Sequence, residues 1–265
     1  MNIVRAMKIH NALVKQELKR FLEYKSDFAM GIFSFLTGQT LYLFFIWIVF
    51  SNIPNLVGWS LGEIVFLYGF SLIPKGIDHL LFDNLWTFAN FTVKNGDFDK
   101  YLVRPVNTLF YVMAERVQID ALGELLMGII LIAGVLPYLS IEIDIIKMFI
   151  FFLVIPFSSL IYTGIKIITA SISFWIKQSG NITYSIYMVN DFARYPVKIY
   201  NNMLRTIITY IIPFAFTAYY PVEFILTGEK LLFNIGFTIV ISIILMLMGI
   251  FLWNKGIKKY ESAGS

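Results

Sequence analysis

Three ionisable residues stand close together in an otherwise apolar stretch of this sequence: Lys75, Asp78 and His79. Separations of three and four residues place these side chains on one face of a helix. Ionisable groups in such a segment can relay protons or hold a polar substrate. The simpler interpretation is structural: Lys75 extends out of the apolar segment and Asp78 is its ion-pair partner. The residues alone leave both interpretations open.

A second polar group consists of Glu115, Arg116, Asp120 and Glu124. In a continuous helix, Arg116, Asp120 and Glu124 follow one another at intervals of four residues and form a ladder of charges on one face. The simplest interpretation of this ladder is a structural set of ion pairs at the end of a membrane span. The alternative is that it lines a pathway for ions or substrate.

Residue types that the sequence lacks exclude several kinds of chemistry. There is no cysteine, which excludes thiolate metal sites, iron–sulfur clusters and disulfides. Two histidines, His10 and His79, are too few for a multi-histidine metal site. No Gly-Lys dipeptide occurs, so a Walker A phosphate loop is absent, and there is no HExxH motif. We therefore expect no catalytic residues, no metal and no cofactor bound by this chain.

The composition indicates which elements must position these polar groups. Of the 265 residues, 58% are apolar and only 14% are charged, and the mean hydropathy is +0.74. A soluble domain usually has about 25% charged residues, so this chain has too little polar surface to coat one. A membrane span needs about 20 residues, and six spans use roughly 120. The composition predicts an all-α, multi-pass protein of a cell membrane.

Apolar runs and basic residues predict the topology. Residues 1–27 have the pattern of an amphipathic helix with a cationic face, which would lie at the membrane interface. Lys and Arg crowd this segment and the tail at 255–265, so both termini should be cytoplasmic. The basic residues are spread along the predicted membrane edges and do not form one patch, so we expect no binding to nucleic acid. Clear spans are predicted at about residues 28–50, 61–82, 109–136, 145–166 and 231–253.

The region between the last two clear spans is ambiguous. Two termini on one side require an even number of spans, so the segments 183–196 and 206–220 cannot both cross completely. The first segment contains Asp191 and Arg194, and the second is interrupted by Pro213. Positive charge around Arg194 favours a cytoplasmic position for the first segment, so the residues alone leave the choice of the fifth span open.

The longest polar connection, 83–107, contains a compact motif. Gly96 interrupts the preceding chain, Asp97 can cap a short helix, and Pro105 ends it. Phe98, Tyr101 and Leu102 would then be on the apolar side of that helix, a surface suited to docking into a groove of a partner. The predicted contact residues are Asp97, Phe98, Asp99, Lys100, Tyr101, Leu102, Arg104 and Pro105. The alternative interpretation of this segment is an ordinary interfacial loop.

Several stretches of the chain resemble the ABC-2 type permeases of bacterial ABC exporters, and in particular the DUF990-like subfamily. The most specific of them reads G-D-x-D-x-Y-L-x-R-P-x-N over residues 96–107. The others are Gly58-Trp59-Ser60-Leu61-Gly62-Glu63, Leu67-Tyr68-Gly69, Asp191-Phe192-Ala193-Arg194-Tyr195-Pro196 and Ile212-Pro213-Phe214-Ala215. The resemblance extends over nearly the whole chain.

This resemblance implies a fold and a function. The fold is six spans with an N-terminal interfacial helix, with 180–199 as the fifth span and 203–226 as a re-entrant pair before the last. The segment 96–105 would contact a separate ABC ATPase dimer, which uses ATP and Mg²⁺. A second permease chain, identical or related, would complete the translocation path. The expected substrate is hydrophobic or amphipathic: a drug, an antimicrobial peptide or a lipid-linked molecule.

Two other functions compete with this one. A proton-coupled secondary transporter would use the group around Lys75 or the ladder at 115–124, but no inverted repeat is apparent. A membrane-embedded enzyme is disfavoured because polar groups suited to catalysis are sparse.

Overall fold

The computed structural model describes residue 15 and residues 25–139, 141 and 144–261, and in these ranges the regular elements are all helical. This agrees with the predicted all-α class. Five helical stretches are long and apolar enough to cross a membrane: Phe33–Asn52, Leu61–Phe82, Ile119–Tyr138, Ile145–Ile176 and Leu232–Ile257. The predicted interfacial helix of residues 1–27 lies almost wholly outside the described residues.

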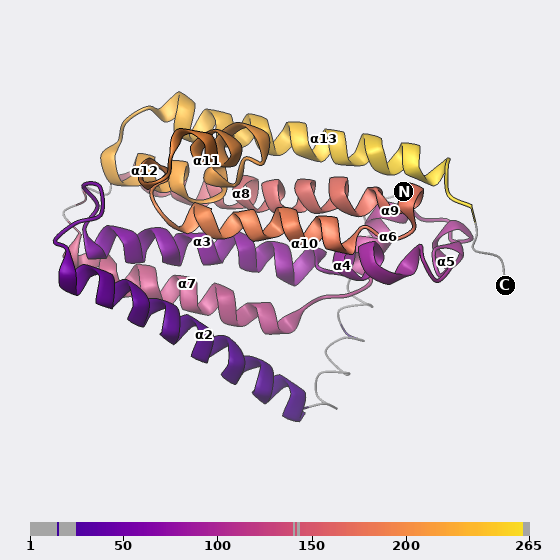
Figure 1. The fold of residues 1–265 in the computed structure, drawn as a ribbon, viewed down its shortest axis with the longest axis horizontal. Helices are drawn as coiled ribbons and strands as arrows, with labels where there is room; N and C mark the ends of the chain where they lie inside the picture. Colours follow the sequence, from indigo (N-terminus) through magenta and orange to yellow (C-terminus); the bar gives the residue numbers. More distant parts are fainter. Residues whose placement is uncertain (1–14, 16–24, 140, 142–143, 262–265) are drawn as a thin grey trace.

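The long helices form an elongated bundle (Figure 1). Helices α2 and α7 run in one direction along it, and α3, α8 and α13 run in the opposite direction. Helix α8 packs on both α13 and α3, and α3 packs on α7. Their bounds are α2 Lys25–Asn52, α3 Leu61–Phe82, α7 Leu122–Val135, α8 Ile145–Ser171 and α13 Phe237–Ile257.

Shorter helices join them. Between α3 and α7 lie α4 (Asn84–Thr87), the π-helix η1 (Phe88–Thr92), α5 (Asp99–Leu102), α6 (Thr108–Ala114) and η2 (Ile119–Ala121). After α7 come η3 (Leu136–Tyr138) and, beyond α8, α9 (Ser173–Ile176), α10 (Gly180–Met188), η4 (Val189–Arg194) and η5 (Val197–Ile199). The last group is α11 (Asn202–Thr206), η6 (Ile207–Ile211), η7 (Phe214–Thr217), α12 (Tyr219–Thr227) and η8 (Leu232–Gly236).

Local capping sets where two of the long helices begin. Ser60 and Glu63 form a reciprocal capping box at the start of α3, in which each side chain accepts the backbone N–H of the other. Asp144 caps α8 by accepting the N–H of Lys147 at 2.6 Å. These side chains satisfy N–H groups that have no partner inside the helix.

Glycines allow the closest helix contacts. A Cβ atom placed on Gly128 of α7 would lie 2.7 Å from the carbonyl oxygen of Gly69 on α3. Likewise, a Cβ atom on Gly164 of α8 would lie 2.8 Å from the Cβ of Leu245 on α13. Small residues are frequent at helix interfaces in membranes, because packing rather than the hydrophobic effect holds helices together there.

The third predicted span needs correction. Residues 109–136 are not one helix, because α6 ends at Ala114 and α7 begins only at Leu122. The apolar stretch that could cross a membrane starts at Ile119. The backbone between Glu115 and Gln118 is not helical, so the regular four-residue spacing predicted for the charged ladder is lost there.

The region between α8 and α13 also differs from a simple span. Helix α10 and η4 together reach only from Gly180 to Arg194, and this stretch is not among the five long apolar helices. It nevertheless packs on the bundle, α10 on α8 and η4 on α3, and runs in the direction of α2 and α7 (Figure 1). Helices α11 and α12 gather at the end of the bundle where α2 ends and α3 begins. There the rings of Trp59 and Tyr219 are 5.6 Å apart.

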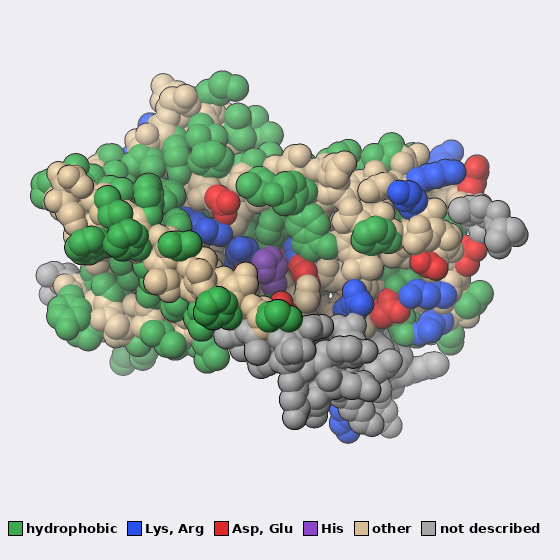
Figure 2. All heavy atoms as spheres, turned by 60° about the horizontal axis from the view of Figure 1, so that its bottom comes forward, with side chains coloured by type: hydrophobic (Ala, Val, Ile, Leu, Met, Phe, Trp, Pro, Cys, Tyr) green, Lys and Arg blue, Asp and Glu red, His purple; other side chains and the backbone are tan. Residues whose placement is uncertain are grey.

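The surface is divided along the length of the bundle. Hydrophobic side chains cover most of the long helices, whereas charged side chains gather at the end that carries α5 and α6 (Figure 2). A smaller polar group that includes a histidine lies midway along this face. Helix α2 is the least embedded of the long helices, with exposed large side chains that include Phe33, Leu41 and Trp47.

Candidate functional site

A buried ion pair joins α8 to α3. The ammonium group of Lys166 lies 2.7 Å from Asp78 Oδ2 and 2.9 Å from Asp83 Oδ1. The side chains of Lys166 and Asp78 are fully buried. Thr163 donates a hydrogen bond to Asp78 Oδ1 at 2.8 Å. Buried charges are tolerated only when they are paired and hydrogen-bonded, and here both conditions are met for Asp78.

Three ionisable residues form a second cluster one turn away. Lys75 Nζ lies 3.6 Å from Glu124 Oε1, and His79 Nδ1 lies 3.1 Å from Glu124 Oε2. This arrangement corrects the predicted pairing of Lys75 with Asp78. Lys75 and His79 face α7, whereas Asp78 faces α8, so residues three positions apart on α3 pair with different helices.

Tyr187 of α10 connects the two clusters. Its hydroxyl donates to Asp78 Oδ2 at 3.2 Å and lies 2.9 Å from His79 Nε2. A tyrosine hydroxyl has one hydrogen, so in this arrangement Nε2 of His79 is the donor to Tyr187.

Together these side chains form what we call the central ion network. It contains three carboxylates, Asp78, Asp83 and Glu124, two lysines, Lys75 and Lys166, and His79, bridged by Tyr187. It ties together α3, α7, α8 and α10. Because every ionisable group of the network lies within 3.6 Å of a partner of opposite type, the network is suited to holding helices in register rather than to catalysis.

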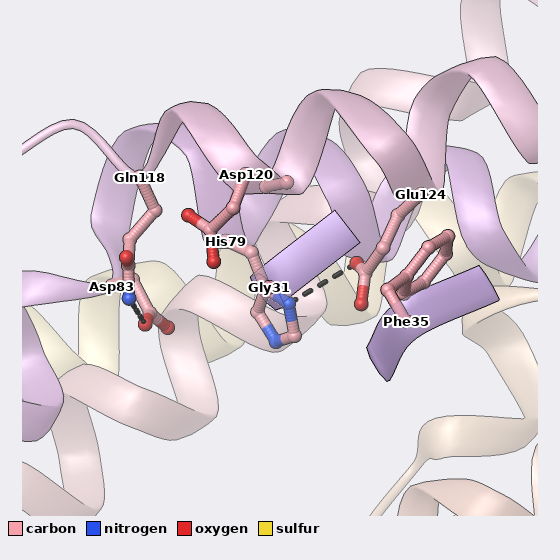
Figure 3. Close-up of a pocket in the computed structure, with 8 residues that line it drawn as sticks. Gly31, Phe35, His79, Asp83, Gln118, Asp120 and Glu124 are labelled. Atoms are coloured by element: carbon pink, nitrogen blue, oxygen red, sulfur yellow. Dashed lines mark hydrogen bonds and ion pairs between the residues drawn. The ribbon is translucent and has the colours of Figure 1, made fainter. Parts of the chain in front are cut away.

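A small polar cavity lies beside this network. Figure 3 shows His79 and Asp83 of the α3 end facing Asp120 and Glu124, with Gly31 and Phe35 of α2 on the remaining side. Gln118 Nε2 donates to Asp83 Oδ2 at 2.7 Å. Burial opposes ionisation of Asp83, but the nearby cations Lys166 and His79 and the hydrogen bonds from Lys166 and Gln118 lower its pKa below the ordinary value. Asp83 therefore stays ionised at neutral pH.

The charged ladder predicted at 115–124 is not formed. Arg116 is exposed in the non-helical stretch, and Asp120 is exposed in η2. Only Glu124 enters the central ion network. Glu115 instead pairs with Lys100 at 3.0 Å and accepts a hydrogen bond from Tyr101. The break after Ala114 turns the two halves of the ladder toward different neighbours.

The pair near the end of η4 is a local one. Arg194 Nη2 lies 2.9 Å from Asp191 Oδ1, one helical turn earlier. The guanidinium of Arg194 also lies 5.6 Å from the ring of Tyr42 and 5.9 Å from that of Tyr68. These cation–π contacts, within or near the usual 6 Å, link η4 to α2 and α3.

The 96–105 segment has a different exposed face from the predicted one. Phe98 and Tyr101 are buried in the chain's own core, where the ring of Phe98 contacts those of Phe88, Phe174 and Trp253. They are therefore not available as anchors for a partner. Gly96 does adopt a positive φ of 77°, as a chain-breaking glycine allows. Asp97 makes no capping hydrogen bond, and α5 has only four residues.

Other members of this segment face solvent. Val103 is 82% exposed and Leu102 44% exposed, the most exposed apolar side chains of the segment. Beside them a polar cleft of about 470 Å³ lies between this segment and the α6 region. The exposed residues of the segment are Asp97, Asp99, Lys100, Leu102, Val103, Arg104 and Pro105.

Three residues of the central ion network were not predicted as site residues: Lys166, Asp83 and Tyr187. The sequence could have identified Lys166, because a lysine deep in the 27-residue apolar helix α8 requires a buried anion. Nothing in the sequence identifies Asp83 or Tyr187, since each lies near a helix end, where polar residues are common. Among the described residues, no group of three or more His, Asp or Glu side chains is arranged to hold a metal ion.

Comparison with known proteins gives one match. A family model described as "ABC-2 family transporter protein" matches residues 36–264, which is most of the chain. No curated protein and no solved structure matches.

Proposed function

Since this chain belongs to the ABC-2 family of transporter proteins, a multi-pass membrane permease without ATPase activity of its own, we propose that it is the permease subunit of an ATP-driven exporter. A separate ABC ATPase dimer supplies the energy from ATP and Mg²⁺. A second permease chain, identical or related, completes the translocation path. The substrate is hydrophobic or amphipathic, such as a drug, an antimicrobial peptide or a lipid-linked molecule.

One observation carries the coupling part of this proposal. Val103 and Leu102 form an exposed apolar tip at the end of α5, with the exposed Lys100 and Arg104 beside them in the chain. Exposed aliphatic side chains flanked by charge are typical of a surface that a partner covers. The buried side chains of Phe98 and Tyr101 anchor this segment in the core. The segment should therefore move as a rigid unit when the ATPase moves it.

Hydrogen bonds lead from this tip toward the central ion network. Tyr101 donates to Glu115, and Asn84 Nδ2 lies 3.5 Å from the same carboxylate. Asn84 follows Asp83, which pairs with Lys166. We propose that movement of the 96–105 segment reaches α3 and α8 along this route, so that both helices move as one unit.

The proposed topology has six crossings with both termini in the cytoplasm. The fifth crossing is 180–199, built on α10 and η4, and 203–226 is a re-entrant pair. The packing of α10 on α8 and of η4 on α3 supports the crossing, and the gathering of α11 and α12 at one end supports the re-entrant pair. This topology places Arg194, Lys198 and Arg205 outside. Two of them have anions nearby, since Arg194 pairs with Asp191 and Lys198 lies 3.5 Å from Glu223.

Cysteine crosslinking tests the coupling proposal, because the native chain has no cysteine. Val103→Cys should crosslink to the ATPase subunit when its thiol is alkylated with a maleimide that carries a short photoreactive diazirine and the complex is then illuminated. Tyr138→Cys, equally exposed at the opposite end of the bundle, is the matched control and should give no such product. Crosslinking of both variants to the ATPase, or of Tyr138→Cys alone, would contradict the proposal.

A further inference from the structure

An apolar groove runs along the outside of the bundle between α7 and α8. Both helices pack on α3, which forms the floor of the groove through Phe66 and Ile73. The walls include Ile129 of α7, Leu136 at the start of η3, and Phe151 and Ile155 of α8. Its volume is about 450 Å³, and it opens to the surface of the bundle.

The lining is hydrocarbon except at one position. Lys147, in the first turn of α8, is the single residue of the lining with a charged or polar side chain. A groove of this kind is unfavourable for water, which needs polar partners, and favourable for another hydrocarbon. Several of its rim side chains, among them Ile129, Met148 and Phe152, are 49–65% exposed and would contact such an occupant.

The dimensions match one leaflet of a bilayer. From Lys147 to Ile155 a helix rises about 12 Å. Half of a hydrocarbon core measures about 15 Å. Lys147 lies at the start of the candidate span Ile145–Ile176, where lipid headgroups begin. The groove therefore runs from headgroup depth toward the middle of the membrane.

The ammonium group of Lys147 has room and charge for an anion. No described carboxylate lies within ion-pair distance of it, although Asp144 caps the same helix through the backbone. Gly228 faces the Lys147 side chain: a Cβ there would lie 3.5 Å from Cε and 3.7 Å from Nζ. The absent side chain leaves the ammonium accessible from the α12 end.

We propose that this groove binds one phospholipid with an anionic headgroup as a resident lipid. One acyl chain lies between α7 and α8, and its phosphate pairs with Lys147. Charge complementarity at the membrane edge and the leaflet-length apolar lining select this occupant. The bound chain fills the space between two helices that meet mainly through α3.

Photo-crosslinking in vesicles tests the proposal. The intact transporter is placed in phosphatidylcholine vesicles containing a trace of phosphatidylglycerol with a diazirine on one acyl chain, and labelled residues are mapped by mass spectrometry. Label should concentrate on groove residues such as Phe151 and Ile129 rather than on the exposed faces of α2 and α13. The matching phosphatidylcholine probe should label the groove less.

Two substitutions sharpen the test. Lys147→Gln should reduce groove labelling by phosphatidylglycerol about fivefold, the effect of one basic residue near an anionic headgroup. Lys147→Arg should retain it, and Lys177→Gln, which removes an exposed lysine outside the groove, should leave it unchanged. Equal labelling in Lys147→Gln and the native chain would overturn the proposal. So would even labelling of groove and α2, or crosslinks from the groove to a second protein chain.

Discussion

Lys166 of α8 and Asp78 of α3 form an ion pair of 2.7 Å in which both side chains are fully buried. Neither residue lies at a solvent-filled opening, so the pair acts as a fixed connection between two membrane helices. With Asp83, Tyr187, His79 and Glu124 it links four helices in the half of the bundle nearest the 96–105 segment, the proposed contact with the ATPase. Disturbing this connection should affect both stability and coupling.

Removal of the Lys166 charge should be the most damaging single change in the network. Lys166→Met leaves two carboxylates without their cation and should cost about 3–5 kcal/mol of stability, the usual effect of breaking a buried pair from one side. Thermal unfolding in detergent measures this. Lys177→Met, at an exposed position beyond the end of α9, is the control and should melt like the native chain. An unchanged melting temperature in Lys166→Met would contradict the buried pair.

Tyr187→Phe should separate the two halves of the network. The change removes the hydroxyl that lies between His79 and Asp78 and leaves the ring, so we expect a loss of about 1–3 kcal/mol. Stimulation of the partner ATPase by transport substrate should fall as well. Tyr184→Phe, on the exposed face of the same helix, provides the control. If both variants behave alike, the hydroxyl of Tyr187 has no special role.

The α3–α7 contact should tolerate no side chain at its closest point. Gly128→Val places atoms against the backbone of Gly69 and should force the helices apart, lowering the yield of folded protein and its melting temperature. Gly134→Val is a matched control on α7, because a Cβ at Gly134 has nothing within 4 Å. Size-exclusion profiles and melting curves of the two variants distinguish a packing effect from a general cost of valine.

Phe98 and Val103 should respond in opposite ways to substitution. Phe98→Ala opens a cavity among aromatic rings and should lose about 3–5 kcal/mol of stability. Val103→Asp changes an exposed tip and should keep the native melting temperature while losing ATPase association. Co-purification with the ATPase and melting curves measure the two effects. A stable Phe98→Ala variant that has lost its ATPase would favour Phe98 itself as the docking residue.

The sequence by itself determined the all-helical class and the membrane character. Apolar runs long enough to cross a bilayer are a one-dimensional property, because a helix in lipid satisfies its own backbone. Four of the five clear spans match long apolar helices within a few residues at their start, and the third differs because its polar first part is not continuous helix. The 96–107 motif and the absence of a Walker A phosphate loop can also be read from the sequence alone, without a structure.

Only the tertiary structure decided which charges meet. Spacing placed Lys75, Asp78 and His79 on neighbouring positions of α3, but small differences in direction send Lys75 to α7 and Asp78 to α8. In the same way, the amphipathic pattern around Phe98 predicted an apolar face for a partner, and this was wrong for Phe98 and Tyr101, because the chain's own core buries both rings. A pattern along one helix specifies which residues need burial or an opposite charge. Which element covers such a residue or carries the opposite charge depends on how separate helices pack.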